Sequence, residues 1–167
     1  PDTPRFQFRA CDAEPLPFPK GQDLIVSCSA IQWFEHPERF LCQCKDLLKT
    51  EGYLAFSTFG PQNVREVASL TSEALPYRSL EELRRMLSGV YQIVYSREEL
   101  LHRTFSSPLD VLKHLQATGV TGIRNRKWTK GQLEDFCRRY HRQYAAPDGT
   151  VSLTYHPIYM ICKKQEQ

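Results

Sequence analysis

The sequence predicts an α/β fold built on an open, mostly parallel sheet. Two apolar runs, Leu24–Val26 and Tyr53–Phe59, flank a segment with a helical pattern. The first run is apolar at consecutive positions, which is typical of a strand buried on both faces. A strand, a helix and a second strand in this length indicate a parallel pair with a right-handed crossover. We therefore expect these two strands to be adjacent and central in the sheet.

The segment between the two strands carries the apolar stripe of a helix. Its apolar residues recur at i, i+1, i+4, i+7 and i+8, namely Phe40, Leu41, Cys44, Leu47 and Leu48. Pro37 suits the first turn of this helix, and Gly52 suits the position just past its end. Because ligands of such sheets bind beyond the carboxyl ends of the strands, we expect a site at residues 27–33 and 57–60.

Alternation predicts the strands outside this central unit. Phe6–Ala10 alternates apolar and polar residues, as a half-buried strand does. Tyr91–Phe105 alternates at its start and predicts a bent strand or a loose hairpin. Val151–Lys163 is expected to close the sheet as a reversed strand. Pro157 inside it requires a bulge or an unpaired edge, because proline has no N–H for the ladder.

Helix start and stop signals predict the other helices. Capping boxes at Ser79–Glu82 and Thr129–Gln132 each open a helix. Ser107 followed by a proline opens another, which is expected to stop at Gly119. An apolar pattern that includes Val64 favours one more helix after the second central strand.

The composition is that of an ordinary soluble globular protein. The 167 residues are 41% apolar and 25% charged, with a net charge of +3, and suit one domain over residues 1–167. This charge is too small to indicate nucleic-acid binding, although it suits an acidic partner. No apolar run reaches the ~18 residues of a membrane span. The six cysteines contain no C-x-x-C pair, so we expect reduced core cysteines, no metal site and a cytoplasmic protein.

The glycines do not form a nucleotide-binding turn. A complete doubly wound enzyme would have a Gly-rich turn after its first strand, at a helix N-terminus. None of the eight glycines here forms a G-x-G pair. We therefore expect a domain that lacks the N-terminal half of its sheet, and we expect this chain to be inactive alone. Exposed apolar sheet surface would then favour a dimer of the truncated chain.

Four stretches resemble the class I S-adenosylmethionine-dependent methyltransferases, which have a Rossmann-like sheet. They are Asp12–Phe18, Asp23–Ser27, Ala30–Trp33 and Leu48–Pro61. Three runs narrow the resemblance to the malonyl-acyl-carrier-protein O-methyltransferases of biotin synthesis, namely Phe56–Pro61, Leu115–Gly119 and Leu153–Tyr159. The likeness covers essentially the whole chain, but only the C-terminal two thirds of the family's length.

The resemblance implies S-adenosylmethionine as the cofactor. Asp12 would accept a hydrogen bond from the adenine amine, and the Ala13 N–H would meet a ring nitrogen. The alternative for Asp12 is a turn or capping carboxylate. The methionine end would lie against the strand tip formed by Ser27, Cys28 and Ser29. The family usually has asparagine where this chain has Cys28.

The resemblance also implies a substrate pocket and a protein partner. Gln32 and Trp33 would face cofactor or substrate, although Trp33 also suits a core position. Thr58, Phe59 and the adjacent glycine would border the acyl pocket. The residues that could hold the substrate carboxylate are Arg103, Arg124 and Tyr155. Acidic acyl carrier protein would dock on basic residues of the C-terminal third, namely Arg124, Arg126, Lys127, Arg138 and Arg139.

The implied reaction needs no general base, because a malonyl carboxylate, with a pKa of about 4, is already ionised near pH 7. Positioning and a partly dry site would supply the rate. Two other interpretations stay open. One is a methyltransferase of the same fold that acts on another small molecule. The other is a methyltransferase-like domain that only binds a protein partner.

Overall fold

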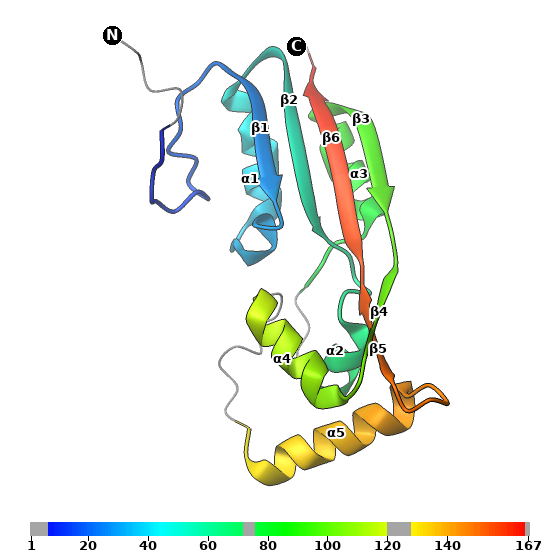
Figure 1. Ribbon diagram of the computed structural model, residues 1–167. Helices are drawn as coiled ribbons and strands as arrows, with labels where there is room; N and C mark the ends of the chain where they lie inside the picture. The colour runs from blue at the N-terminus through cyan, green and yellow to red at the C-terminus, as the bar shows by residue number, and fades with distance from the viewer. Residues whose placement is uncertain (1–6, 72–75, 120–127, 166–167) are drawn as a thin grey trace.

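Strands and helices follow one another along the chain largely as the sequence predicts. The computed structural model describes residues 7–71, 76–119 and 128–165 (Figure 1). Its strands are β1 (Gln22–Cys28), β2 (Leu48–Phe59), β3 (Tyr91–Glu98), β4 (Leu101–Phe105), β5 (Val151–Tyr155) and β6 (Pro157–Lys164). Its α-helices are α1 (Pro37–Gln43), α2 (Arg65–Thr71), α3 (Leu80–Ser88), α4 (Pro108–Thr118) and α5 (Lys130–Tyr144). Two short 3-10 helices, η1 (Ile31–Trp33) and η2 (Cys44–Asp46), flank α1.

The main sheet has the strand order β1-β2-β6-β3. β1 and β2 are parallel neighbours, with Leu24 opposite Tyr53, which confirms that the two strands of the central unit are adjacent. β6 runs antiparallel to both β2 and β3, which confirms the reversed C-terminal strand. Within the described residues, however, β1 is an edge strand and only the β1–β2 pairing is parallel, so the expected central β1 and mostly parallel sheet are wrong in those details.

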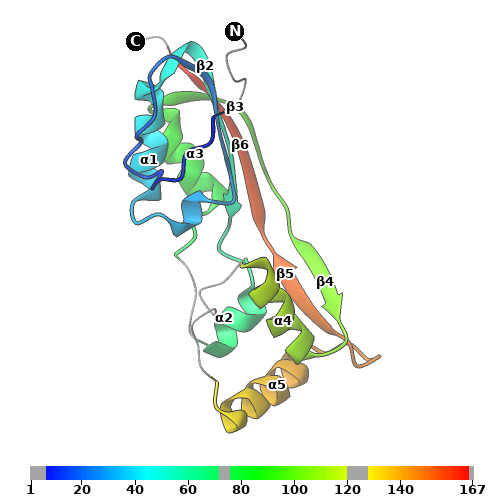
Figure 2. The ribbon, with the colours of Figure 1, turned by 60° about the vertical axis from the view of Figure 1, so that its left-hand side comes forward.

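The two faces of this sheet differ. Figure 2 shows α1 and α3 on the same face, where they pack with Leu54, Phe56 and Met160 in one buried core. On the other face Leu24 is 54% and Val26 58% exposed. The prediction of a strand buried on both faces is therefore wrong for the described part of the chain. Consecutive apolar residues place side chains on both faces of a strand, but here only one of those faces has helices packed on it.

Exposed apolar side chains continue across this open face, because opposed residues of paired strands point to the same side. The exposed residues from the four strands are Leu24, Val26, Tyr53, Tyr95, Tyr159 and Ile161. The open face is thus a single apolar surface rather than scattered residues.

The crossover helix is shorter than the apolar stripe predicts. α1 ends at Gln43 and β2 already begins at Leu48, so Gly52 lies inside a strand and not just past a helix. A Cβ at Gly52 would lie 3.0 Å from the Lys49 carbonyl oxygen and 3.1 Å from that of Gln22. This close approach accompanies the shift in register between β1 and β2 at Gln22, and it explains the glycine.

The capping signals are all confirmed. Ser79 and Thr129 form complete capping boxes at the starts of α3 and α5. Ser107 caps α4, and Gly119 ends it in the left-handed conformation with φ 66°. The expected helix after β2 is α2, although it is only seven residues long. α2, α4 and α5 pack with β5 around a second core that includes Leu115, Phe136 and Leu153.

The expected N-terminal strand is absent from the described residues 7–21, which form turns and extended chain. Phe8 is 98% exposed. Alternation in the sequence gives a segment one apolar face. A strand also needs a neighbouring strand with which to form hydrogen bonds, however, and no described strand pairs with this segment.

The closing strand is broken at His156, and β5 and β6 lie in different sheets. Pro157 is the first residue of β6, opposite Phe59 of β2, so the bulge or unpaired edge that the sequence predicts there is wrong. The His156 carbonyl accepts a hydrogen bond from the Gly60 N–H at 2.7 Å. Its Nδ1 accepts from the Gln62 N–H at 3.2 Å, so the ring hydrogen is on Nε2, which donates to Glu98 at 3.0 Å. These contacts join a sheet half (β1, β2, β3, β6, α1, α3) to a helical half (α2, α4, α5, β4, β5).

Gly60 should be the glycine least tolerant of substitution. A Cβ there would lie 2.5 Å from two ring atoms of the buried His156, whose hydrogen bonds hold the ring in place. We expect Gly60→Ala to lower the free energy of unfolding by about 1–3 kcal/mol in urea denaturation. Gly89→Ala is the matched control, because its φ is −77° and nothing lies within 4 Å of an added Cβ. Equal effects of the two substitutions would contradict this account.

Candidate functional site

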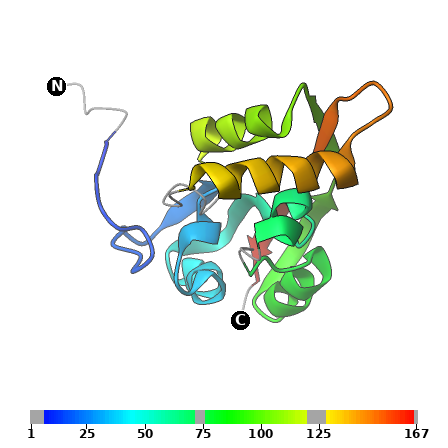
Figure 3. The same ribbon diagram turned by 90° about the horizontal axis from the view of Figure 1, so that it is seen from below.

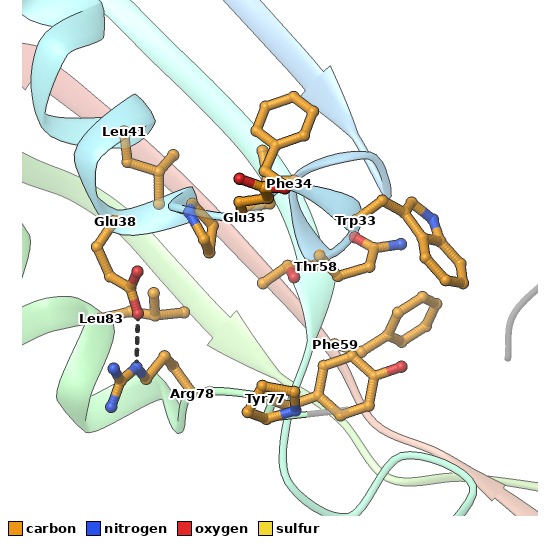
Figure 4. Close-up of a pocket in the computed structure, with 14 residues that line it drawn as sticks. Trp33, Phe34, Glu35, Glu38, Leu41, Thr58, Phe59, Tyr77, Arg78 and Leu83 are labelled. Atoms are coloured by element: carbon orange, nitrogen blue, oxygen red, sulfur yellow. Dashed lines mark hydrogen bonds and ion pairs between the residues drawn. The ribbon is translucent and has the colours of Figure 1, made fainter. Parts of the chain in front are cut away.

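A cavity of about 430 Å³ lies beyond the carboxyl ends of β1 and β2, where the sequence places the site. Figure 4 shows the side chains around it. Its lining combines aromatic and aliphatic side chains with a few polar groups, among them Trp33, Phe34, Leu41, Thr58, Phe59, Tyr77 and Leu83. A mostly apolar pocket with few polar groups is the usual form of a small-molecule site. The structure thus brings together Gln32, Trp33, Thr58 and Phe59, all four predicted as substrate-side residues.

The tip of β1 is held in an unusual backbone conformation. Ser29 has φ 49°, in the left-handed region that serine seldom adopts. Its N–H bonds the carbonyl of Ser57 at 3.0 Å and the hydroxyl of Ser57 at 3.1 Å, so the neighbouring strand stabilises the turn. Backbone strain of this kind is concentrated at functional sites. Ser27 is half-buried, whereas Cys28 and Ser29 are exposed at the end of the strand.

Gln32 is the clearest sign of a ligand in the pocket. Its amide nitrogen donates to the Ser29 carbonyl at 2.6 Å. That bond points its other amide atom, Oε1, into buried space, where it has no hydrogen-bond partner among the described residues. A buried acceptor without a partner costs free energy, so Gln32 is suited to receive an N–H or O–H from a bound molecule.

The Asp12 loop is tied to the loop after β1 by Glu14. The Glu14 carboxylate accepts from the N–H groups of Glu35 at 2.9 Å and His36 at 2.5 Å. Asp12 itself forms a turn, because its Oδ1 accepts from the Glu14 N–H at 3.0 Å. Both interpretations of Asp12 stay compatible with this geometry, since its second oxygen makes no bond among the described residues. The role of Glu14 was missed, although it stands in the same motif.

The floor and rim of the pocket come from a loop that sequence reasoning did not single out. The Phe59 ring packs against Tyr77, with centroids 6.2 Å apart. Arg78 donates from Nε to Glu38 at 2.8 Å, and this bond holds the pKa of Glu38 below its ordinary value. Tyr77 and Arg78 precede the Ser79 capping box in an irregular segment, so no helix or strand periodicity could have identified them.

Two of the predicted carboxylate-holding residues lie outside the pocket lining. Tyr155, on β5, packs against Phe59 at 6.3 Å between centroids, and its hydroxyl bonds His114 Nε2 at 2.8 Å. Burial raises the pKa of Tyr155. Arg103 is exposed on β4, on the same face as Tyr155. Phe59 therefore stands between Tyr155 and the pocket. The third candidate, Arg124, lies outside the described residues.

The predicted docking surface is only partly described. Arg124, Arg126 and Lys127 fall outside the described residues. Arg138 and Arg139 are exposed on α5, and both pair with Asp135, Arg139 at 3.9 Å. In Figures 1 and 3, α5 lies at the end of the molecule farthest from the main sheet, beside α4. These two arginines are therefore on a different part of the surface from the pocket.

The cysteines form no disulfide. Cys44 and Cys162 are buried in the core of the sheet half, as expected, but Cys11 and Cys28 are exposed, so the prediction of core cysteines holds only in part. Across residues 7–71, 76–119 and 128–165, no three His, Cys, Asp or Glu side chains gather as a metal site would require. No helix in these segments is long and apolar enough to span a membrane.

Comparison with known proteins reveals close relatives. A family model described as a methyltransferase domain matches residues 1–56. A malonyl-[acyl-carrier protein] O-methyltransferase from Bacteroides helcogenes is 48% identical over 163 residues, 97% of this chain and 60% of the relative. One of the same name from Bacteroides fragilis is 50% identical over 96% of this chain and 33% of the relative. The chain thus spans less than two thirds of the length of these relatives.

Solved structures share the fold at low sequence identity. The YcgJ protein of Bacillus subtilis aligns with a TM-score of 0.59 at 18% identity, over 96% of this chain and 72% of its own. A Bacillus halodurans protein described as a methyltransferase aligns with a TM-score of 0.61 at 16% identity, over 93% of this chain and 70% of its own. The [4+2]-cyclase SpnF aligns with a TM-score of 0.53 at 15% identity, over 96% of this chain and 56% of its own. The likeness establishes the Rossmann-like methyltransferase fold, while SpnF shows that this fold also serves other chemistry.

Proposed function

We propose that this chain, a homologue of the malonyl-[acyl-carrier protein] O-methyltransferases, is the substrate-binding part of an S-adenosylmethionine-dependent methyltransferase of malonyl-acyl carrier protein. The observation that carries the proposal is the pocket beyond β1 and β2, whose wall contains the buried Gln32 Oε1 with no hydrogen-bond donor among the described residues. The relatives named for this activity support it. The family resemblance implies a cytoplasmic enzyme of biotin synthesis.

The residues of the β1 side fit the cofactor. One Asp12 oxygen is held in a turn, and the other is open to an adenine amine. Glu14 fixes this loop against residues 35–36. The tip formed by Ser27, Cys28 and Ser29 would face the methionine end, next to the Gln32 acceptor. These 167 residues contain no glycine-rich turn whose backbone N–H groups could bind the methionine tail.

The chain's own residues would position the substrate rather than activate it. The carboxylate is ionised at neutral pH, so no proton has to be removed. When bound, S-adenosylmethionine supplies a methyl group: the O–CH3 bond forms as the S–CH3 bond breaks, and the electron pair of the broken bond stays on sulfur. Trp33, Phe59 and Leu83 would exclude water from the acyl group, which strengthens the remaining polar contacts.

The proposed activity can be tested with the full-length protein and with these 167 residues alone. We expect the full-length protein to methylate malonyl-acyl carrier protein, detected as a mass increase of one methyl group, and not acetyl-acyl carrier protein, which lacks a free carboxylate. The isolated chain should show no methyl transfer, and calorimetry should show cofactor binding only at about millimolar concentration. The reason is that the contacts of a glycine-rich turn with the methionine tail are missing, and each 1.4 kcal/mol of binding free energy lost lowers the affinity about tenfold.

Three results would contradict these expectations. Micromolar cofactor binding by the isolated chain would mean that its cofactor site is complete. Transfer to a small-molecule carboxylate but not to the carrier would favour a methyltransferase of the same fold with another substrate. Carrier binding by the full-length protein without cofactor binding would favour a domain that only binds a partner.

The proposal includes an acidic carrier docking on basic residues. Reversing Arg138 and Arg139 to Glu in the full-length protein should slow methylation of the carrier-bound substrate and flatten its salt dependence, because surface charges mainly steer encounter. Arg124, Arg126 and Lys127 belong to the same proposed surface. Methylation of a small malonyl thioester should hardly change. Reversing Arg85, which pairs with Glu81 on α3 at 2.8 Å, is the control, and equal loss on both substrates would contradict the proposal.

A further inference from the structure

Tyr77 presents a neutral hydroxyl at the pocket. In Figure 4 its ring crosses the floor below Phe59, and its hydroxyl lies on the side of Trp33, away from Glu38 and Arg78. The side chain is half-buried. Burial raises the pKa of Tyr77, so the hydroxyl keeps its proton at neutral pH.

A hydrogen-bond relay from the junction determines what this hydroxyl can do. The His156 backbone N–H donates to Asn63 Oδ1 at 3.2 Å, and an N–H can only donate. This bond fixes the Asn63 amide, which is buried, so that its Nδ2 faces Tyr77 and donates to Tyr77 Oη at 3.4 Å. Tyr77 is thus the acceptor in its contact with Asn63. Its own O–H has no acceptor within the described part of the chain.

The cation of the pocket is already paired with carboxylates. Arg78 is the one cation among the described lining residues. It donates from Nε to Glu38 and lies 3.7 Å from Glu82. On the Trp33 side of the floor, Tyr77 therefore offers an anionic oxygen a neutral phenol donor and not a guanidinium.

We infer that Tyr77 donates a hydrogen bond to the non-reacting oxygen of the substrate carboxylate, and that Asn63 is the positioning residue that leaves the Tyr77 proton available. The inference rests on the proposed function. A neutral donor suits this reaction because the carboxylate loses its charge as the ester forms. A strong ion pair with arginine would stabilise the charged ground state more than the transition state, and would slow transfer.

The test uses Tyr77→Phe in the full-length protein, with malonyl-acyl carrier protein as substrate. A hydrogen bond to a charged group is lost, so we expect kcat/KM to fall about tenfold or more, mainly through KM. Cofactor affinity should stay unchanged. Tyr140→Phe is the matched control, since it also removes a phenol hydroxyl, which donates to the Ser152 carbonyl at 2.7 Å in the other core. It should lower stability and leave KM unchanged.

Asn63→Asp tests the direction of the relay. The introduced carboxylate can still accept a hydrogen bond from the His156 N–H. It cannot donate to the phenol, however, and instead accepts a hydrogen bond from the Tyr77 O–H, which is then no longer available to the substrate. We expect a loss of kcat/KM similar to that of Tyr77→Phe, and little further loss in the double variant. The loss should shrink as the pH falls and the introduced carboxylate becomes protonated, a pH profile that a merely structural defect would not produce.

The outcomes separate the inference from the proposed function. If the wild-type protein transfers no methyl group to the malonyl carrier, both fail. If the wild type is active and Tyr77→Phe keeps kcat/KM within about twofold, the inference alone is overturned. It is also overturned if Tyr77→Phe weakens binding of acetyl-acyl carrier protein as much as that of the malonyl form, because the contact would then be to the thioester carbonyl.

Discussion

The close approach of Gly60 to His156 is the constraint on which the rest of the structure depends. It occurs where β2 ends and where the chain passes from β5 to β6, so it fixes the position of the sheet half relative to the helical half. The proline that follows His156 cannot donate to a sheet, and the break it causes leaves the His156 N–H for Asn63. The buried Glu66 supports the same junction by accepting from the backbone and side chain of Thr154.

This junction also connects the fold to the pocket. Thr58 and Phe59 immediately precede Gly60, and Asn63 follows it, so the position of β2 against His156 sets both the wall of the pocket and the phenol of Tyr77. Phe59 in addition packs on Tyr155 of the helical half. The site is therefore built from segments distant in sequence that share one contact, and its geometry should be sensitive to substitutions that never touch a ligand.

Local signals in the sequence predicted local structure well. The three serine and threonine caps depend only on nearby residues, and all three are confirmed. The β1–β2 pair was also predictable, since a short strand–helix–strand unit has few topologies. The exposure of Leu24 and the placement of Gly52 inside β2 were not predictable, because each depends on what packs across the sheet.

The site was predictable to the same extent. Gln32, Trp33, Thr58 and Phe59 stand at strand ends, where the position of a parallel pair indicates ligand binding. Tyr77 and Asn63 stand in irregular segments, and their roles depend on the direction of hydrogen bonds that only a structure reveals. Arg103 was expected to hold a carboxylate because of its charge alone, and the structure leaves it exposed on β4, outside the pocket lining.

The most direct test of this account is a crystal structure of the full-length protein with S-adenosylhomocysteine and a malonyl-carrier analogue. We expect the malonyl group in the cavity between Trp33, Phe59 and Tyr77, with one carboxylate oxygen about 3 Å from Tyr77 Oη. A malonyl group bound instead beside Tyr155, His114 and Arg103, on the far side of Phe59, would contradict it.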